Sequence, residues 1–174
     1  MFERITKIMF DEIYPILEEA FPVEELREKE RQRALLEKPQ YRLYGIKSPR
    51  GALLGAMALW DFNDFVYVEH FAIKPPYRNG GFGGKRLMEM VGWSRRPVVL
   101  EVEVPIGDVT KRRVGFYERH GFFYNEYPYL QPPMRPGQKM LPLRLMTTPE
   151  KISEDVYKRY KSMIHKIVYE YEEE

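Results

Sequence analysis

The sequence predicts a mixed α/β (α+β) domain with a mostly antiparallel central sheet flanked by helices. Two observations lead to this class. Apolar residues recur at three- and four-residue steps before residue 38 and after residue 148, but alternate as in strands over 41–73. Between residues 73 and 146, predicted helices and strands follow one another. Because no linker divides these regions, we expect residues 1–174 to form a single domain.

The first 38 residues favour a pair of helices. Apolar residues from Ile5 to Leu17 recur at helical spacing, and Phe21-Pro22 ends that pattern. A second, charged helix is expected from Val23 to Lys38. Residues 1–38 therefore predict two N-terminal helices in front of the sheet.

The next segment has the alternation and the turn residues of an antiparallel meander. Strands are expected over 41–46, 52–62 and 65–73, with turns at Ser48-Pro49-Arg50-Gly51 and Asn63-Asp64. Connections this short join antiparallel neighbours, so the three strands are predicted to lie side by side.

Helices and strands alternate in the second half of the chain. In order, we expect a helix over 84–91, a strand over 98–104, a helix over 109–120 ended by Gly121, and strands over 122–127 and 139–146. Thr148-Pro149-Glu150 has the chemistry of a helix start, so an extra closing helix is expected over 148–172. Its apolar stripe favours either cover for the core or a contact in a homodimer.

Composition excludes several classes of function. The 28 Lys and Arg against 26 Asp and Glu leave a net charge of +2 without a concentrated basic stripe, which argues against a nucleic-acid partner. The absence of cysteine excludes disulfides and thiol nucleophiles, and isolated histidines predict no metal site. The longest apolar stretch, residues 51–60, is roughly half of a membrane span, and no secretory signal opens the chain. We therefore expect a cytoplasmic protein without a membrane partner.

The glycine-rich turn after the third strand has the features of an anion site. Its four glycines permit backbone conformations that other residues avoid, and its amides lie beside the positive end of the following helix. A phosphate or pyrophosphate suits such a turn. Two common phosphate motifs do not fit, because a P-loop would need glycine in place of Asn79, and a dinucleotide fingerprint would need glycine in place of Arg86.

The pattern that fits is Arg-x-x-Gly-x-Gly, formed by Arg78, Gly81 and Gly83, and it resembles the coenzyme A pyrophosphate loop of the GNAT N-acetyltransferase superfamily. The context strengthens the resemblance, because Tyr117-Glu118-Arg119-His120-Gly121-Phe122 is similar to the family's Tyr-x-x-x-Gly-Phe signature. The resemblance covers about residues 41–146 and implies a GNAT-like fold around a coenzyme A site. It also implies acetyl-CoA as cosubstrate, no metal, and direct acetyl transfer to an amine of a small molecule or peptide.

The resemblance further implies which residues bind the cofactor. The main chain of Phe71, Ala72 and Ile73 would pair with the pantetheine arm as an added strand does. The pyrophosphate would be held by the turn, whose residues are Arg78, Asn79, Gly80, Gly81, Phe82, Gly83, Gly84 and Lys85. The chain departs from the family where Thr110 replaces a common asparagine and Arg113 replaces a small residue.

Two residues are implied in catalysis. Tyr117 resembles the family's general acid, since a phenol with a pKa of about 10 is protonated at pH 7 and can donate to a departing thiolate. Glu69 lies where many members place a carboxylate that acts on the amine through water. Strand alternation puts Glu69 and Phe71 on one face and His70 and Ala72 on the other, which makes His70 a rival base. The alternatives are packing for Tyr117, a salt bridge for Glu69 and a satisfied buried position for His70.

The acceptor site is expected near the Tyr- and Pro-rich loop over 124–137, which lies where similar proteins shape the acceptor pocket. Tyr127, Tyr129 and Arg135 are its candidate substrate residues. Glu101 and Glu103 share a strand face, which favours either an acceptor-amine site or a polar sheet face. A different class of function remains open, a coenzyme A-binding sensor or interaction module without turnover, although the presence of Tyr117 favours an enzyme.

Overall fold

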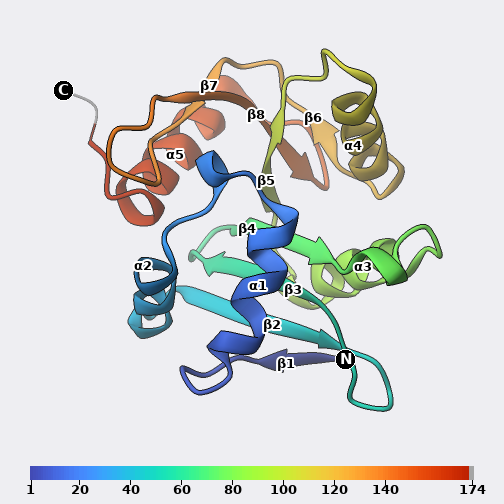
Figure 1. Ribbon diagram of the computed structural model, residues 1–174. Helices are drawn as coiled ribbons and strands as arrows, with labels where there is room; N and C mark the ends of the chain where they lie inside the picture. The colour runs from blue at the N-terminus through green and yellow to red at the C-terminus, as the bar shows by residue number, and fades with distance from the viewer. Residues whose placement is uncertain (173–174) are drawn as a thin grey trace.

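The computed structural model describes residues 1–172, and its sheet confirms the predicted mixed α/β class (Figure 1). The last two residues of the predicted 1–174 domain lie outside the described residues. Within them the sheet has eight strands in the order β1-β2-β3-β4-β5-β8-β6, and β7 also pairs with β8. All pairs are antiparallel except β4 with β5. The strands are β1 Phe2–Arg4, β2 Tyr41–Lys47, β3 Leu53–Asp61, β4 Val66–Ile73, β5 Val98–Glu103, β6 Phe123–Tyr124, β7 Tyr129–Gln131 and β8 Leu141–Thr148.

Helices cover both faces of the sheet. They are α1 Phe10–Ala20, α2 Lys29–Ala34, α3 Phe82–Ser94, α4 Asp108–Arg119 and α5 Glu154–Met163, which continues as a π-helical turn, Ile164–Val168. Short 3-10 turns occupy Val23–Glu25, Leu35–Glu37 and Pro75–Tyr77. Leu17 of α1 and Tyr160 of α5 belong to one apolar core, whereas Leu87 of α3 and Val114 of α4 belong to a second core. The sheet therefore separates two cores.

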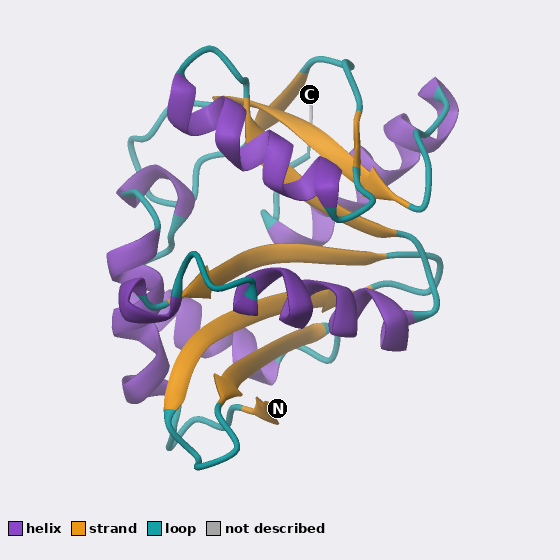
Figure 2. Cartoon of the chain, turned by 90° about the vertical axis from the view of Figure 1, so that its right-hand side faces the viewer, coloured by secondary structure: helices purple, strands orange, loops and turns teal. Residues whose placement is uncertain are grey.

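The sheet opens between its fourth and fifth strands. β4 and β5 pair only from Val66–Val98 to Val68–Leu100, after which no further partners join them. Figure 2 shows the strands separating into two groups. The remainder of β4, residues 69–73, keeps β3 on one edge and has no strand on the other.

The N-terminal region differs from the predicted pair of long helices. Phe2–Arg4 forms an edge strand instead of leading into a helix, and α1 begins only at Phe10. The predicted helix from Val23 to Lys38 is interrupted, because Leu26 is extended and buried and Arg27 is buried beside it. Tertiary contacts of Arg27 therefore override the helical pattern of this segment.

The C-terminal half follows the predicted order with shifted ends. The strand predicted over 122–127 shortens to β6, because the buried Asn125 side chain donates to the Leu145 carbonyl and the Thr147 hydroxyl. The closing helix does not begin at Thr148, which ends β8, but after Ser153, whose hydroxyl accepts from the Val156 amide. The loop predicted over 124–137 contains the short strand β7.

Candidate active site

A bulge in β4 decides where its polar side chains lie. Ala58 pairs with His70 and Leu59 with Val68, so Glu69 is an extra residue in β4. Because of this bulge, Glu69 and His70 both contact the N-terminal segment, through Arg27 and the Glu25 carbonyl, whereas Phe71 packs in the second core. The prediction that Glu69 shares a face with Phe71 is therefore wrong.

The opening between β4 and β5 contains a cavity of about 260 Å³. Its walls come from the segment after α1, from both separating strands, from α4 and from the loop before β8. The polar and charged residues of the wall are Glu25, Glu69, Arg78, Glu101, Glu103, Arg113, Tyr117 and Gln131. One cavity thus joins Arg78 of the predicted pyrophosphate turn with Tyr117 of α4.

The glycine-rich turn is open to solvent and is not filled by its own side chains. Asn79 and Gly81 adopt left-handed conformations with φ of 66° and 73°. A Cβ added at Gly80 or Gly81 would meet no atom within 4 Å, and Asn79, Gly80 and Lys85 are exposed. No side chain caps the start of α3, so its first amides face outward. The turn therefore fits a diphosphate held by main-chain nitrogens.

The remaining predicted cofactor residues frame this turn. Arg78 donates from Nε to the Ile73 carbonyl at 2.6 Å, which fastens the turn to the end of β4. Gly83 lies beneath the side chains of Ile73 and Phe71, and Phe82 is partly buried against the second core. The open edge of β4 over 69–73 leads from the turn along the cavity, as expected for an extended pantetheine arm.

Gly84 lets α3 approach α4 closely. A Cβ at this position would overlap the His120 ring, whose Nδ1 donates to the Phe116 carbonyl at 2.7 Å. Gly121 follows in the left-handed conformation predicted for the end of α4, with φ of 78°. The signature segment around Tyr117 therefore packs against the helix that begins at the glycine turn.

Tyr117 has the position and the free hydroxyl of a proton donor. Its ring packs edge-on against Phe116 and Phe122, and its hydroxyl forms no hydrogen bond with any described residue. Burial raises the pKa of Tyr117 to about 12, with Glu25 also raising it and Arg113 opposing. The phenol is therefore protonated at neutral pH and available to a ligand in the cavity.

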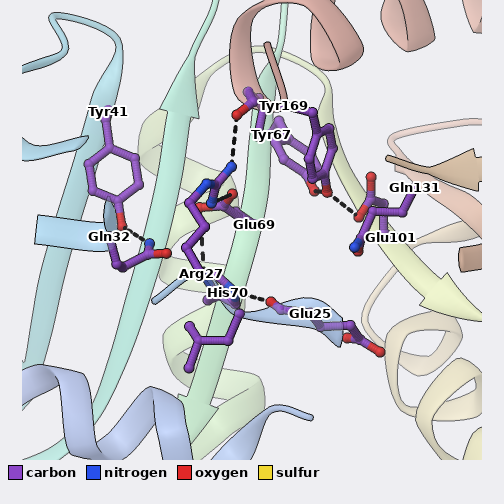
Figure 3. A network of polar contacts seen from close by, with 12 residues as sticks. Glu25, Arg27, Gln32, Tyr41, Tyr67, Glu69, His70, Glu101, Gln131 and Tyr169 are labelled. Atoms are coloured by element: carbon purple, nitrogen blue, oxygen red, sulfur yellow. Dashed lines mark hydrogen bonds and ion pairs between the residues drawn. The ribbon is translucent and has the colours of Figure 1, made fainter. Parts of the chain in front are cut away.

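Glu69 is neutralised by a buried arginine (Figure 3). Arg27 Nη1 lies 2.5 Å from Glu69 Oε1, and both side chains are less than a tenth exposed. Burial alone would raise the pKa of Glu69, but the charges of Arg27 and His70 and the hydrogen bonds it accepts lower it overall. His70 does not line the cavity. Its Nε2 donates to the Glu25 carbonyl at 2.8 Å, and burial lowers its pKa.

Glu25 lines the cavity although the sequence pattern did not indicate it as a site residue. The 3-10 turn Val23–Glu25 places its carboxylate on the cavity wall and directs it away from His70 (Figure 3). The pKa of Glu25 is raised to about 7, mainly by burial and also by the charge of Glu103, against the opposing charge of Arg113. Arg113, noted above as a departure from the family, forms an ion pair with Glu103, whereas Thr110 caps the start of α4 through Gly107.

The three predicted acceptor residues, Tyr127, Tyr129 and Arg135, form hydrogen bonds to other parts of the chain. Tyr127 lies outside this cavity, where it stacks on Tyr157 and donates to the Ile152 carbonyl at 3.2 Å. Arg135 fastens its loop to the N-terminal segment by donating from Nε to the Leu26 carbonyl at 2.7 Å. Tyr129 is buried and reaches the site indirectly, because its hydroxyl donates to Glu101. From this loop, Gln131 and Met134 line the cavity.

Some of these residues left a signal in the sequence. Glu101 and Glu103 alternate with valines on β5, and the structure places both on the cavity, as the acceptor-site interpretation requires. Glu25 and Arg27 lie in a charged segment whose pattern is typical of an exposed helix. The sequence pattern therefore did not indicate that they contribute to the site.

Neither a metal-binding cluster nor a membrane-spanning helix occurs in the part of the chain that the structure describes. Over residues 1–172, no group of three His, Asp or Glu side chains could hold a metal ion. Across the same range, every helix is too short or too polar to cross a lipid bilayer. The expected cytoplasmic location and the possible homodimer stay predictions, although the apolar stripe of α5 packs on the core through Tyr157, Tyr160 and Ile164.

Comparisons with known proteins show which proteins this chain is similar to. A curated protein named "Putative acetyltransferase YjbC", from Bacillus subtilis (strain 168), is 30% identical over 112 residues, which cover 63% of this chain and 55% of that protein. The solved structure of a "Putative acetyltransferase from GNAT family" from Bacteroides thetaiotaomicron matches with a TM-score of 0.92 and 37% identity over 99% of both chains.

A more distant structure shares the fold. The spermidine N-acetyltransferase from Vibrio cholerae in complex with CoA and spermine has a TM-score of 0.64 and 13% identity, over 84% of this chain and 93% of its own. The family model for the acetyltransferase (GNAT) family matches residues 9–122. That range includes the glycine turn, the open edge of β4 and the signature tyrosine. The chain belongs to the acetyltransferase (GNAT) family.

Proposed function

We propose that the protein is an acetyl-CoA-dependent N-acetyltransferase that acts on an amine of a small molecule or peptide. The observation that carries this proposal is that Tyr117, whose hydroxyl has no hydrogen-bond partner among the described residues, lines the same cavity as the open edge of β4 and Arg78 of the pyrophosphate turn. Acetyl-CoA, when bound, supplies an activated thioester. The main chain of residues 71–73 would hold its pantetheine arm, and the turn 78–85 would hold its diphosphate.

Tyr117 would act as the general acid. Its hydroxyl keeps its proton at neutral pH, because burial raises the pKa to about 12. The leaving sulfur, whose conjugate acid has a pKa of about 8.5, is basic enough to need that proton. A coenzyme A-binding module without turnover would have no use for a partly buried phenol without a hydrogen-bond partner at this place.

Glu25 would act as the base, in preference to Glu69. A general base works best when its pKa lies near the working pH, and the pKa of Glu25 is raised to about 7 by burial. The pKa of Glu69 is lowered, and its ion pair with Arg27 fits the salt-bridge alternative. A carboxylate of Glu25 can take a proton from the amine, directly or through one water, beside Tyr117.

The experiment measures thiol release and acetylated product with a panel of amines. Tyr117→Phe should lower kcat by about a hundredfold or more, whereas Tyr44→Phe on β2, outside the cavity, serves as the matched control with unchanged kcat. Coenzyme A binding with no turnover of any amine would instead establish the sensor function.

The base is assigned by comparing two further variants. Glu25→Gln should lower kcat at an unchanged unfolding midpoint, because its carboxylate forms no ion pair with a described residue. Glu69→Gln should mainly lower stability, because it leaves Arg27 buried without its partner. Loss of kcat in a folded Glu69→Gln with full activity in Glu25→Gln would return the role of base to Glu69.

A further inference from the structure

Glu101 occupies a part of the cavity that the proposed chemistry does not use. It lies on β5, at the point where β5 leaves β4, and lines the same cavity as Tyr117 and Glu25. The charge of Glu25 raises the pKa of both Tyr117 and Glu101, so Glu25 lies within electrostatic reach of both residues. The cavity therefore contains an acidic group, Glu101, in addition to the proposed reacting residues Tyr117 and Glu25.

Tyrosine hydroxyls hold the Glu101 carboxylate in a fixed orientation (Figure 3). Tyr129 donates to Oε1, and Tyr169, just after the π-helical turn, donates to Oε2 at 2.8 Å. The Tyr169 oxygen in turn accepts from Tyr67 of β4 at 3.1 Å, because its own hydrogen is used on Glu101. Burial raises the pKa of all three phenols well above the ordinary value, so they remain donors.

The negative charge of the Glu101 carboxylate lacks a counter-ion among the described residues. Glu69 pairs with Arg27 and Glu103 with Arg113, but no cationic side chain of residues 1–172 forms an ion pair with Glu101. Burial outweighs the opposing effect of the tyrosine donors, so that the pKa of Glu101 is raised to about 7. In the same wall, the buried Oε2 of Glu69 accepts no hydrogen bond from a described residue.

A cationic group of a ligand would compensate the unpaired charge of the Glu101 carboxylate. A desolvated carboxylate without a positive partner is unfavourable, and a charged hydrogen bond to it is among the strongest in proteins. The hydroxyls prevent the carboxylate from turning away, so it is preorganised for a donor from the cavity. A single water needs only about 10–15 Å³ of cavity volume, so a cavity of about 260 Å³ has room for a short aliphatic chain.

We propose that Glu101 binds a second cationic group of the acceptor, and that the preferred acceptors are short aliphatic diamines. One nitrogen would lie beside Glu25 and Tyr117 and receive the acetyl group, while the other donates to Glu101. This inference rests on the proposed N-acetyltransferase function and adds the class of acceptor. The competing interpretation is that Glu101 only links the three tyrosines of the core.

The test compares two acceptors that differ in one group. Diaminobutane and aminobutanol have the same length, but only the diamine has a second cation. In the wild-type protein, kcat/KM should be higher for diaminobutane by about tenfold or more. In Glu101→Gln, which keeps the size of the side chain, the ratio of the two kcat/KM values should fall at least about tenfold. Glu126→Gln, an exposed glutamate outside the cavity, is the matched control with an unchanged ratio.

The outcomes separate the two proposals. Equal kcat/KM for the two acceptors in the wild-type protein, or an unchanged ratio in Glu101→Gln, would overturn the diamine inference and leave the N-acetyltransferase function standing. The first of these results needs no variant, so a Glu101→Gln protein that failed to fold would not remove the test. Absence of acetyl transfer to every amine would overturn the proposed function and this inference with it.

Discussion

Replacing Arg27 with methionine should destabilise the protein more than any surface ion pair could. The variant keeps much of the side-chain volume but removes three interactions. These are the 2.5 Å ion pair with Glu69, the 2.7 Å hydrogen bond from Nη2 to the Val168 carbonyl, and the contact with the Tyr169 ring. Because the side chains of Arg27 and Glu69 are only 7% and 1% exposed, Glu69 would be left as a buried, unpaired charge. Losing one partner of such a pair costs about 3–5 kcal/mol.

The pH dependence gives a second measure of the same effect. In the wild-type protein the pKa of Glu69 is lowered from 4.5, so its contribution to stability is complete above that value and is lost as the pH falls through the lower, folded pKa. Without Arg27, burial would raise the pKa of Glu69 instead. The stability gap between Arg27→Met and wild type should therefore be wider at pH 7.5 than at pH 5.5.

The assay is urea unfolding of both proteins at these two pH values. Arg159→Met is a matched control, because Arg159 also forms an ion pair and lies over a tyrosine ring, but its side chain is 55% exposed. It should cost roughly 1 kcal/mol or less. A loss in Arg27→Met no larger than in this control, or a gap independent of pH, would refute the reasoning. Adding Glu69→Gln to Arg27→Met should restore part of the loss.

Three further predictions concern the cofactor turn and the base. Gly81→Val should weaken coenzyme A binding about tenfold or more by calorimetry, because φ is 73° and the main chain must face the diphosphate. Gly51→Val, at φ of 83° in the open turn between β2 and β3, should not change the affinity, and equal effects of the two variants would contradict the site. Gly84→Ala should cost about 1–3 kcal/mol by pushing against His120, and His120→Ala should rescue it in thermal unfolding, whereas no rescue would disprove the contact. With a monoamine, kcat/KM should rise with pH and level off at about pH 7, as Glu25 loses its proton. Glu25→Gln should remove this change of slope from the pH profile. A change of slope that persists in the variant would assign the titration to another group.

Local patterns were sufficient to predict the elements that form the cofactor side of the site. The strand over 65–73 and the helix ending before Gly121 depend on alternation and on a residue that tolerates positive φ, both of which are local properties. The open turn around Gly81 likewise follows from glycine spacing beside a helix start. The resemblance to the GNAT family assigned these segments to coenzyme A.

The contacts around Glu69, Arg27 and Glu101 join segments that are far apart in the sequence, so local patterns did not indicate them. The bulge at Glu69 is visible only in the pairing with β3, so the sequence indicated a regular strand and the wrong face. Arg27 interrupts a helical pattern because its partners lie at residues 69 and 168. Tyr127 and Tyr129 are close in sequence, yet only Tyr129 reaches Glu101, since β7 pairs with β8 at that residue.

The hydrogen bonds that join Arg27 to Val168 and Glu101 to Tyr169 also bear on the order of events during translation. A nascent chain emerges from its amino end, so Arg27, Glu69 and Glu101 leave the ribosome long before Tyr169. Until the segment containing Val168 and Tyr169 docks, Glu101 lacks the hydrogen bond from the Tyr169 hydroxyl, and the Arg27 guanidinium lacks its bond to the Val168 carbonyl. A fragment trimmed to the family match, residues 9–122, would also omit Gln131, Met134 and Leu143 from the wall. The proposed acceptor site would be complete only after residue 169 has been synthesised.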